Sequence, residues 1–141
     1  MQRVSEASVS VDETVVATSG AGLVVLLGVA IGDESDSTEA LARKIAHLRV
    51  FPDDEGRLHR SLVDIGGEAL VVSQFTLVAD TGKGNRPSFT QAAERPLAER
   101  LYEHFCDALE REGVPVARGV FGAQMQVSLV NDGPVTLVLE R

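Results

Sequence analysis

Residues 23–29 read LVVLLGV, and every residue in this run except the glycine is apolar, with branched side chains throughout. Such a run is typical of a strand that is buried on both faces. Residues 69–78, ALVVSQFTLV, follow two glycines and predict a second central strand of the same kind. A sheet built around two such strands needs other layers to cover it, so we expect a layered domain.

Further strands are predicted on both sides of these runs. Residues 3–11 and 14–18 read as two strands joined by an acidic turn, and residues 124–130 alternate apolar and polar side chains. Residues 131–136, NDGPVT, separate this last strand from another β-rich run at 136–140. Asn, Asp and Gly tolerate positive φ, so the pattern predicts a tight reversal, in which Pro134 removes an amide donor where pairing would resume.

Two helices are predicted between the strands. The first follows a polar loop in which Asp36 and Glu39 resemble a capping box, and the second begins near Pro96 and ends at Glu112, before Gly113. Their apolar faces contain Leu41, Ile45 and Leu48 in the first helix and Leu97, Leu101, Phe105 and Leu109 in the second. The chain is therefore predicted to be a single layered α/β domain over residues 1–141, with a mostly antiparallel or mixed sheet and two main helices on one face.

Composition narrows the classes of function. The chain has 13 Lys and Arg against 21 Asp and Glu, a formal net charge of −8, which argues against coating a long polyanion. That charge balance is compatible with binding a few nucleotides at the end of a long polyanion. No apolar run is long enough to span a bilayer and no signal peptide is apparent, so a soluble cytoplasmic protein is expected.

The common catalytic patterns are missing. The single Cys106 lies mid-helix, the three histidines have no acid partner that the sequence indicates, and no metal-ligand spacing or Walker loop is present. No metal or cofactor is expected. Ser73, Gln74 and Thr76 interrupt the end of the second central strand. They mark either a strand that simply leaves the core or a ligand site, since ligands often bind at such strand ends.

Two motifs together resemble the D-aminoacyl-tRNA deacylase family. They are Ser-Gln-Phe-Thr-Leu at 73–77 and Asn-Asp-Gly-Pro-Val-Thr at 131–136. Supporting stretches occur in the same order at 2–4, 79–80, 86–89, 101–102 and 121–125, so the resemblance covers essentially the whole chain. It implies a barrel-like fold of α/β/β layers and a homodimeric hydrolase without a cofactor. The implied substrates are D-aminoacyl-tRNA and glycyl-tRNA, cleaved at the 3′ end.

The same resemblance implies roles for individual residues. Ser73, Gln74, Phe75 and Thr76 would line the catalytic pocket. Gly133 and Pro134, joined by a cis peptide bond and followed by Val135 and Thr136, would reach across the dimer into the partner's pocket and select the substrate's chirality. Arg3 would brace that motif, and Phe121 and Met125 would help to hold the terminal adenosine. Independently of the resemblance, the charge pattern predicts that Lys83 and Arg86, together with Arg57 and Arg60, contact two or three phosphates of the single-stranded acceptor end.

Two other functions remain open at this point. A non-enzymatic nucleic-acid-binding or assembly module would keep the fold without the reaction, although two complete motifs argue against it. A general esterase would use Ser73 as its nucleophile, but the sequence has neither a Gly-x-Ser-x-Gly elbow nor a recognisable histidine partner.

Overall fold

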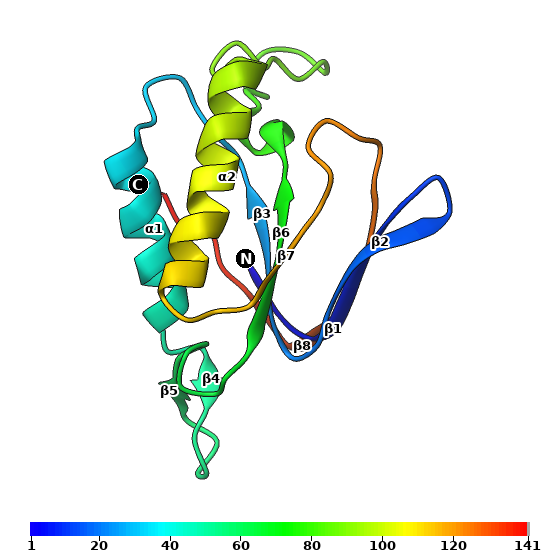
Figure 1. The fold of residues 1–141 in the computed structure, drawn as a ribbon. Helices are drawn as coiled ribbons and strands as arrows, with labels where there is room; N and C mark the ends of the chain where they lie inside the picture. Colours follow the sequence, from blue (N-terminus) through cyan, green and yellow to red (C-terminus); the bar gives the residue numbers. More distant parts are fainter. Residues whose placement is uncertain (141) are drawn as a thin grey trace.

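A strongly curved mixed sheet carries two helices on one face (Figure 1). The structure is a computed structural model and describes residues 1–140. The strand order is β2-β1-β3-β6-β7, and β8 pairs with the other edge of β1. These strands are β1 (Gln2–Val11), β2 (Thr14–Ser19), β3 (Gly22–Leu27), β6 (Glu68–Ser73), β7 (Val116–Arg118) and β8 (Gln126–Thr136). The strands β4 (Phe51–Pro52) and β5 (Leu58–Arg60) form a separate small hairpin.

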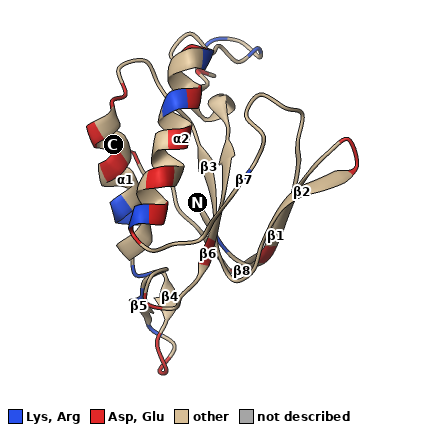
Figure 2. Cartoon of the chain, in the orientation of Figure 1, with Lys and Arg blue, Asp and Glu red and all other residues tan. Residues whose placement is uncertain are grey.

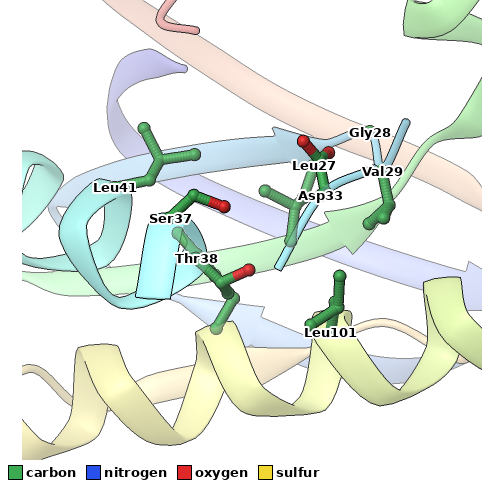
Figure 3. Close-up of a pocket in the computed structure, with 9 residues that line it drawn as sticks. Leu27, Gly28, Val29, Asp33, Ser37, Thr38, Leu41 and Leu101 are labelled. Atoms are coloured by element: carbon green, nitrogen blue, oxygen red, sulfur yellow. The ribbon is translucent and has the colours of Figure 1, made fainter. Parts of the chain in front are cut away.

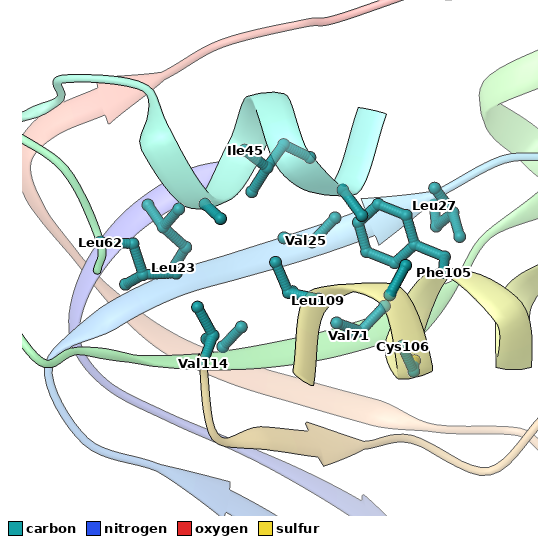
Figure 4. Packing of buried hydrophobic residues seen from close by; sticks show 14 of the residues in the cluster. Leu23, Val25, Leu27, Ile45, Leu62, Val71, Phe105, Cys106, Leu109 and Val114 are labelled. Carbon is teal, nitrogen blue, oxygen red and sulfur yellow. The ribbon is translucent and has the colours of Figure 1, made fainter. Parts of the chain in front are cut away.

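The two apolar runs form neighbouring parallel strands, with Leu23 paired to Ala69 and Leu27 to Ser73. Alternate side chains of β3 and β6 face opposite layers. Leu23 and Val71 belong to the core beneath the helices (Figure 4), whereas Val24 and Leu70 pack against side chains of β1 on the other face. The prediction of two strands buried on both faces is confirmed, and so is the mixed α/β fold with its barrel-like sheet.

The second central strand is shorter than predicted. β6 ends at Ser73, and residues 75–78 form a 3-10 turn, η1 (Phe75–Val78). The amide of Gln74 donates to the carbonyl of Leu27 over 2.8 Å, which is the last rung shared with β3. Because β3 itself ends at Leu27, the chain beyond Gln74 has no strand to pair with and turns away.

The helices α1 (Ser35–His47) and α2 (Arg95–Arg111) lie side by side over β3 and β6 (Figure 1). Leu101, Phe105 and Leu109 of α2 are buried as predicted. The expected capping box at Asp36 and Glu39 is wrong. The capping pair is Glu34 with Ser37, because α1 begins one residue before Asp36 and places that carboxylate inside the first turn.

The predicted reversal at residues 131–136 is also wrong. β8 continues antiparallel to β1 through this stretch: Asn131 pairs with Val4, and Thr136 pairs with Gln2. Residues 132–135 have no pairing partners of their own. All four lie opposite the single residue Arg3 and form a large bulge. The side chain of Asn131 closes this bulge through its amide, which donates to Thr136 Oγ1 over 3.0 Å. A strand partner that continues to Gln2 thus keeps the chain extended where local turn residues favoured a hairpin.

Charged residues gather on the helices and on the loops, whereas the strands are largely uncharged (Figure 2). No helix within residues 1–140 is long and apolar enough to cross a membrane.

Candidate active site

An open pocket of about 800 Å³ lies at the carboxyl end of β6. It brings together the predicted residues Ser73, Gln74, Phe75, Thr76, Phe121 and Met125. The other lining residues are Val29, Val72, Ala92, Ala93, Arg95, Ala98, Gly122, Ala123, Gln124 and Val127. Two segments that are far apart in the sequence, 73–76 and 121–125, therefore form one site.

One wall of the pocket consists of residues 73–76, where β6 ends and the 3-10 turn begins. The amides of Phe75 and Thr76 open the 3-10 turn, so they have no partner within it. The side-chain amide of Gln74 donates to Thr76 Oγ1 over 3.1 Å, which fixes the hydroxyl on the pocket rim. Phe75 is 55% exposed and meets Phe89 edge-on, with 5.0 Å between the ring centroids. The pocket wall thus contains two residues whose amides have no partner within η1, beside an exposed aromatic ring.

The opposite wall contains Phe121 and Met125. Phe121 packs against Tyr102 of α2, and Met125 packs against the backbone at Gly119. The Phe121 ring lies 5.9 Å from the ring of Tyr102, whose hydroxyl donates to the carbonyl of Val71 over 2.8 Å. Burial raises the pKa of Tyr102, so this hydroxyl stays a donor. Met125 packs over Gly119, where a Cβ would come within 2.9 Å of its sulfur. A side chain at 119 would therefore require Met125 to shift.

The second motif lies elsewhere in the same chain. The peptide bond between Gly133 and Pro134 is cis, and both residues are exposed on the bulge opposite Arg3. Arg3 pairs with Leu23 at the start of β3, whereas Ser73 pairs with Leu27 at its end. Four residues of strand separate these positions, which is roughly 13 Å along the strand. Within one chain the bulge and the pocket do not meet.

Arg3 connects the bulge to the body of the protein. Its side chain is only 11% exposed; Nε donates to the carbonyl of Asp132 over 3.0 Å, and Nη1 donates to the carbonyl of Val50 over 2.8 Å. The Val135 amide donates to Asn131 Oδ1 over 3.2 Å. The bulge is therefore held from both sides, and its Gly133–Pro134 tip projects from a fixed base.

The other reactive side chains lie away from the pocket. His47 is 2.8 Å from Glu112, and His104 is 3.0 Å from Glu39, so each has an acid partner that the sequence did not indicate. The His104 side chain is only 28% exposed, because α1 packs beside it. His59 lies in β5, in the small hairpin. No histidine lines the pocket in the part of the chain that the structure describes.

Cys106 is buried in the core beneath the helices, and burial raises its pKa to about 12. We expect a chromogenic disulfide reagent at pH 8 to label the native protein roughly a thousandfold more slowly than the unfolded chain, since the thiolate is the reactive form. The same reaction in guanidinium chloride serves as the control. Equal rates in the two conditions would show that Cys106 is accessible and ionisable in the native state.

A second cavity, of about 30 Å³, lies between the end of β3 and the two helices (Figure 3). Its walls include Leu27, Val29, Thr38 and Leu101. This volume has room for one or two water molecules. It is too small for a substrate. The pocket beside residues 73–76 is the candidate site because it gathers six of the predicted site residues.

The predicted phosphate contacts divide into two groups. Lys83 and Arg86 lie exposed in the loop before α2, the helix that lines the pocket. Arg57 and Arg60 instead belong to the β4–β5 hairpin, where they pair with Asp53, Glu55 and Asp54. None of these four residues is among the residues that line the pocket, so all four phosphate contacts stay predictions.

Comparison with known proteins identifies the family. The family model described as D-Tyr-tRNA(Tyr) deacylase matches residues 1–140. The chain belongs to the D-Tyr-tRNA(Tyr) deacylase family. It is 59% identical over 140 residues to the D-aminoacyl-tRNA deacylase of Roseiflexus castenholzii, covering 99% of this chain and 89% of that one. It is 54% identical to the D-aminoacyl-tRNA deacylase of Deinococcus radiodurans, covering 99% and 97%.

Two solved structures share the fold of this deacylase-family chain. The c-Myc DNA unwinding element binding protein superposes with a TM-score of 0.92 at 42% identity, over 99% of this chain and 95% of that one. A probable eukaryotic D-amino acid tRNA deacylase gives a TM-score of 0.78 over 94% and 92%, and at 18% identity this shows the fold alone.

Sequence reasoning missed the one charged residue that lines the pocket among the described residues, Arg95. It is the first residue of α2, and its guanidinium carbon lies 5.7 Å from the centre of the Phe121 ring. The only signal in the sequence was its place before Pro96 at a helix start, which says nothing about a pocket. Its meeting with Phe121 depends on how α2 packs against the 119–125 loop.

Proposed function

We propose that this chain hydrolyses the ester bond between a D-amino acid and the 3′-terminal adenosine of tRNA, releasing the free D-amino acid and tRNA. The observation that carries the proposal is the single pocket in which residues 73–76 face Phe121 and Met125. One wall contains Phe75 and Thr76, whose amides have no acceptor within residues 1–140, and the other offers an aromatic and a thioether side chain to a nucleoside. Aminoacylated tRNA is used in translation, so we place the activity in the cytoplasm.

The reaction needs no side-chain base. An aminoacyl ester is already activated, so positioning and stabilisation of the oxyanion supply much of the acceleration. The amides of Phe75 and Thr76 are the donors for that oxyanion. The neighbouring ribose 2′-hydroxyl orients or activates the attacking water, which makes the substrate part of the catalyst. Thr76 positions groups and does not attack the ester.

Selection of the D-configuration is assigned to Gly133 and Pro134 of a partner subunit. Their carbonyls hold the α-amino group of the substrate, so a D-side chain points outward and an L-side chain meets backbone. Glycine has no side chain and is not rejected, so glycyl-tRNA is also cleaved. Because the bulge and the pocket are separated within one chain, a homodimer with crossed motifs is the arrangement that unites them.

Exposed apolar side chains support such a dimer. Leu77 is 56% exposed, Leu137 38% and Val138 86%. They lie around a groove of about 460 Å³ that joins the end of η1 to the segment after β8. Contiguous apolar surface of this kind is typical of protein interfaces. Residues 77–78 and 136–140, which line this groove, come at the ends of the two motifs in the sequence, so it is the surface that we propose a second copy covers.

The first test is deacylation of matched D-tyrosyl-, L-tyrosyl- and glycyl-tRNA by the purified protein. We expect rapid loss of the D-ester and of the glycyl ester, while the L-ester survives at its uncatalysed rate. Hydrolysis of both tyrosyl esters would show that the chiral gate is not formed. A folded protein that cleaves none of them would favour a nucleic-acid-binding module, and cleavage of a small chromogenic ester, which has no 2′-hydroxyl, would favour a general esterase.

A further inference from the structure

Arg95 contributes the one charged side chain among the described residues that line the pocket. Its side chain is 69% exposed, and its only ion pair within residues 1–140 is with Glu99, at 3.7 Å from Nε. That distance is long for a charge-assisted hydrogen bond. Both terminal nitrogens of the guanidinium therefore remain available to a ligand.

The guanidinium is supported on two sides. It lies over the Phe121 ring, with 5.7 Å between Cζ and the ring centroid, which is within the range of a cation–π contact. Gly122 lies against its other atoms: a Cβ at this position would come within 3.2 Å of Nη2 and 3.4 Å of Nη1. Gly122 also has a φ of +76°, which favours glycine. An exposed arginine thus lies next to an aromatic ring and to the backbone at Gly122.

The positive charge of Arg95 contrasts with the negative net charge of the whole chain. The formal net charge is −8, yet none of the residues around the pocket is Asp or Glu. Basic side chains also lie in the loop before α2, and the first turns of α2 carry both basic and acidic side chains (Figure 2). A guanidinium at the mouth of an otherwise uncharged pocket is suited to a phosphate, which it contacts through two parallel N–H donors.

We infer that Arg95 binds a phosphodiester within one nucleotide of the esterified adenosine, and so fixes the depth at which the tRNA end enters the pocket. This inference rests on the proposed function, because it takes the 3′ end of tRNA as the ligand. The adenosine lies against Phe121, and the phosphate meets the guanidinium above the same ring. Arg95 is a binding residue here and takes no part in the bond-breaking step.

The test compares Arg95→Gln with wild type on two substrates. With D-tyrosyl-tRNA, KM should rise about tenfold with little change in kcat, as for loss of one charge-assisted contact in an exposed site. The slope of log(kcat/KM) against log salt should become shallower by about 0.7, the value for one phosphate on a single strand. With D-tyrosyl-adenosine, which carries the ester but no phosphate, the loss should disappear.

The matched control is Arg100→Gln, which removes the same charge from an exposed position on α2 outside the pocket. Its KM and salt slope should equal those of wild type. Arg95→Lys keeps the positive charge but lacks the planar guanidinium with its two parallel N–H donors. It should restore the wild-type salt slope, while KM should stay raised.

Two results would overturn the inference. An equal loss on D-tyrosyl-adenosine would mean that Arg95 only braces Phe121, and an unchanged salt slope would mean that it meets no phosphate. A wild-type protein that cleaves neither substrate would instead refute the proposed function, so the two failures are distinguishable.

Discussion

Replacing Gly133 by alanine should lower kcat/KM for D-tyrosyl-tRNA by about 100-fold, the size of effect that a shift of 1 Å in a catalytic constellation produces. Gly133 has a φ of +128°, and a Cβ there would come within 2.9 Å of Arg3 Nη2 and 3.0 Å of Val135 Cγ2. Arg3 is held by the Val50 carbonyl, so the bulge must move instead. The Gly133–Pro134 tip would then miss its place in the partner's pocket. Single-turnover deacylation measures the loss.

The control for this substitution is Gly56→Ala. Gly56 also has a positive φ, +79°, but a Cβ there would meet no atom within 4 Å, and it lies in the turn between β4 and β5. Both variants should lose about 1–2 kcal/mol of stability from backbone strain. Only Gly133→Ala should lose activity. Equal activity of the two variants would show that Gly133 has no role in the active site.

Mixed dimers extend this prediction to the proposed exchange between subunits. One chain carries Gly133→Ala with an intact pocket, and the other carries Thr76→Trp, which fills the pocket, with an intact bulge. Each homodimer should be inactive. Isolated mixed dimers should recover about half of the wild-type rate, because one of their two sites receives an intact bulge and an intact pocket. Mixed dimers as inactive as the parents would show that each chain uses its own Gly133–Pro134.

Removing the 2′-hydroxyl of the terminal adenosine should produce the other large effect. The described residues around the pocket include no histidine, Asp or Glu, so the proposed mechanism leaves activation of water to the substrate. D-tyrosyl-tRNA ending in 2′-deoxyadenosine should therefore be cleaved about 10²–10⁴-fold more slowly, the usual contribution of a positioned acid–base group. The rate should be expressed relative to uncatalysed hydrolysis of the same ester, since the deoxy ester is also intrinsically less reactive.

A tRNA with the deoxy substitution at the penultimate nucleotide is the matched control and should be cleaved normally. Binding of the deoxy substrate should also be unchanged. If the terminal 2′-deoxy substrate turned over at the full rate, a group on the protein would have to replace the hydroxyl. Thr76 would then be the candidate, and a Thr76→Ala protein that binds tRNA but does not turn over would support it.

Apolar patterning alone determined the central part of this fold. The two apolar runs, the turn between the first strands and the apolar face of α2 were all predictable, because strands buried on both faces and amphipathic helices depend on side chains close in sequence. The pairing of motifs 73–77 and 131–136 likewise identified the family without coordinates. These features share one cause: each depends on local residue types rather than on what lies across the sheet.

The tertiary structure decided what those local patterns meant. Residues 131–136 have the composition of a hairpin turn, yet they bulge from a continuous strand because β1 extends to Gln2 and Arg3 binds the Asp132 carbonyl. β6 stops at Ser73 because β3 ends at Leu27, so Phe75 and Thr76 begin a 3-10 turn instead of continuing the strand. Arg95 meets Phe121 only because α2 packs beside a loop that follows it in sequence. In each case the deciding contact joins residues far apart in the chain, and its strength depends on a geometry that no local propensity encodes.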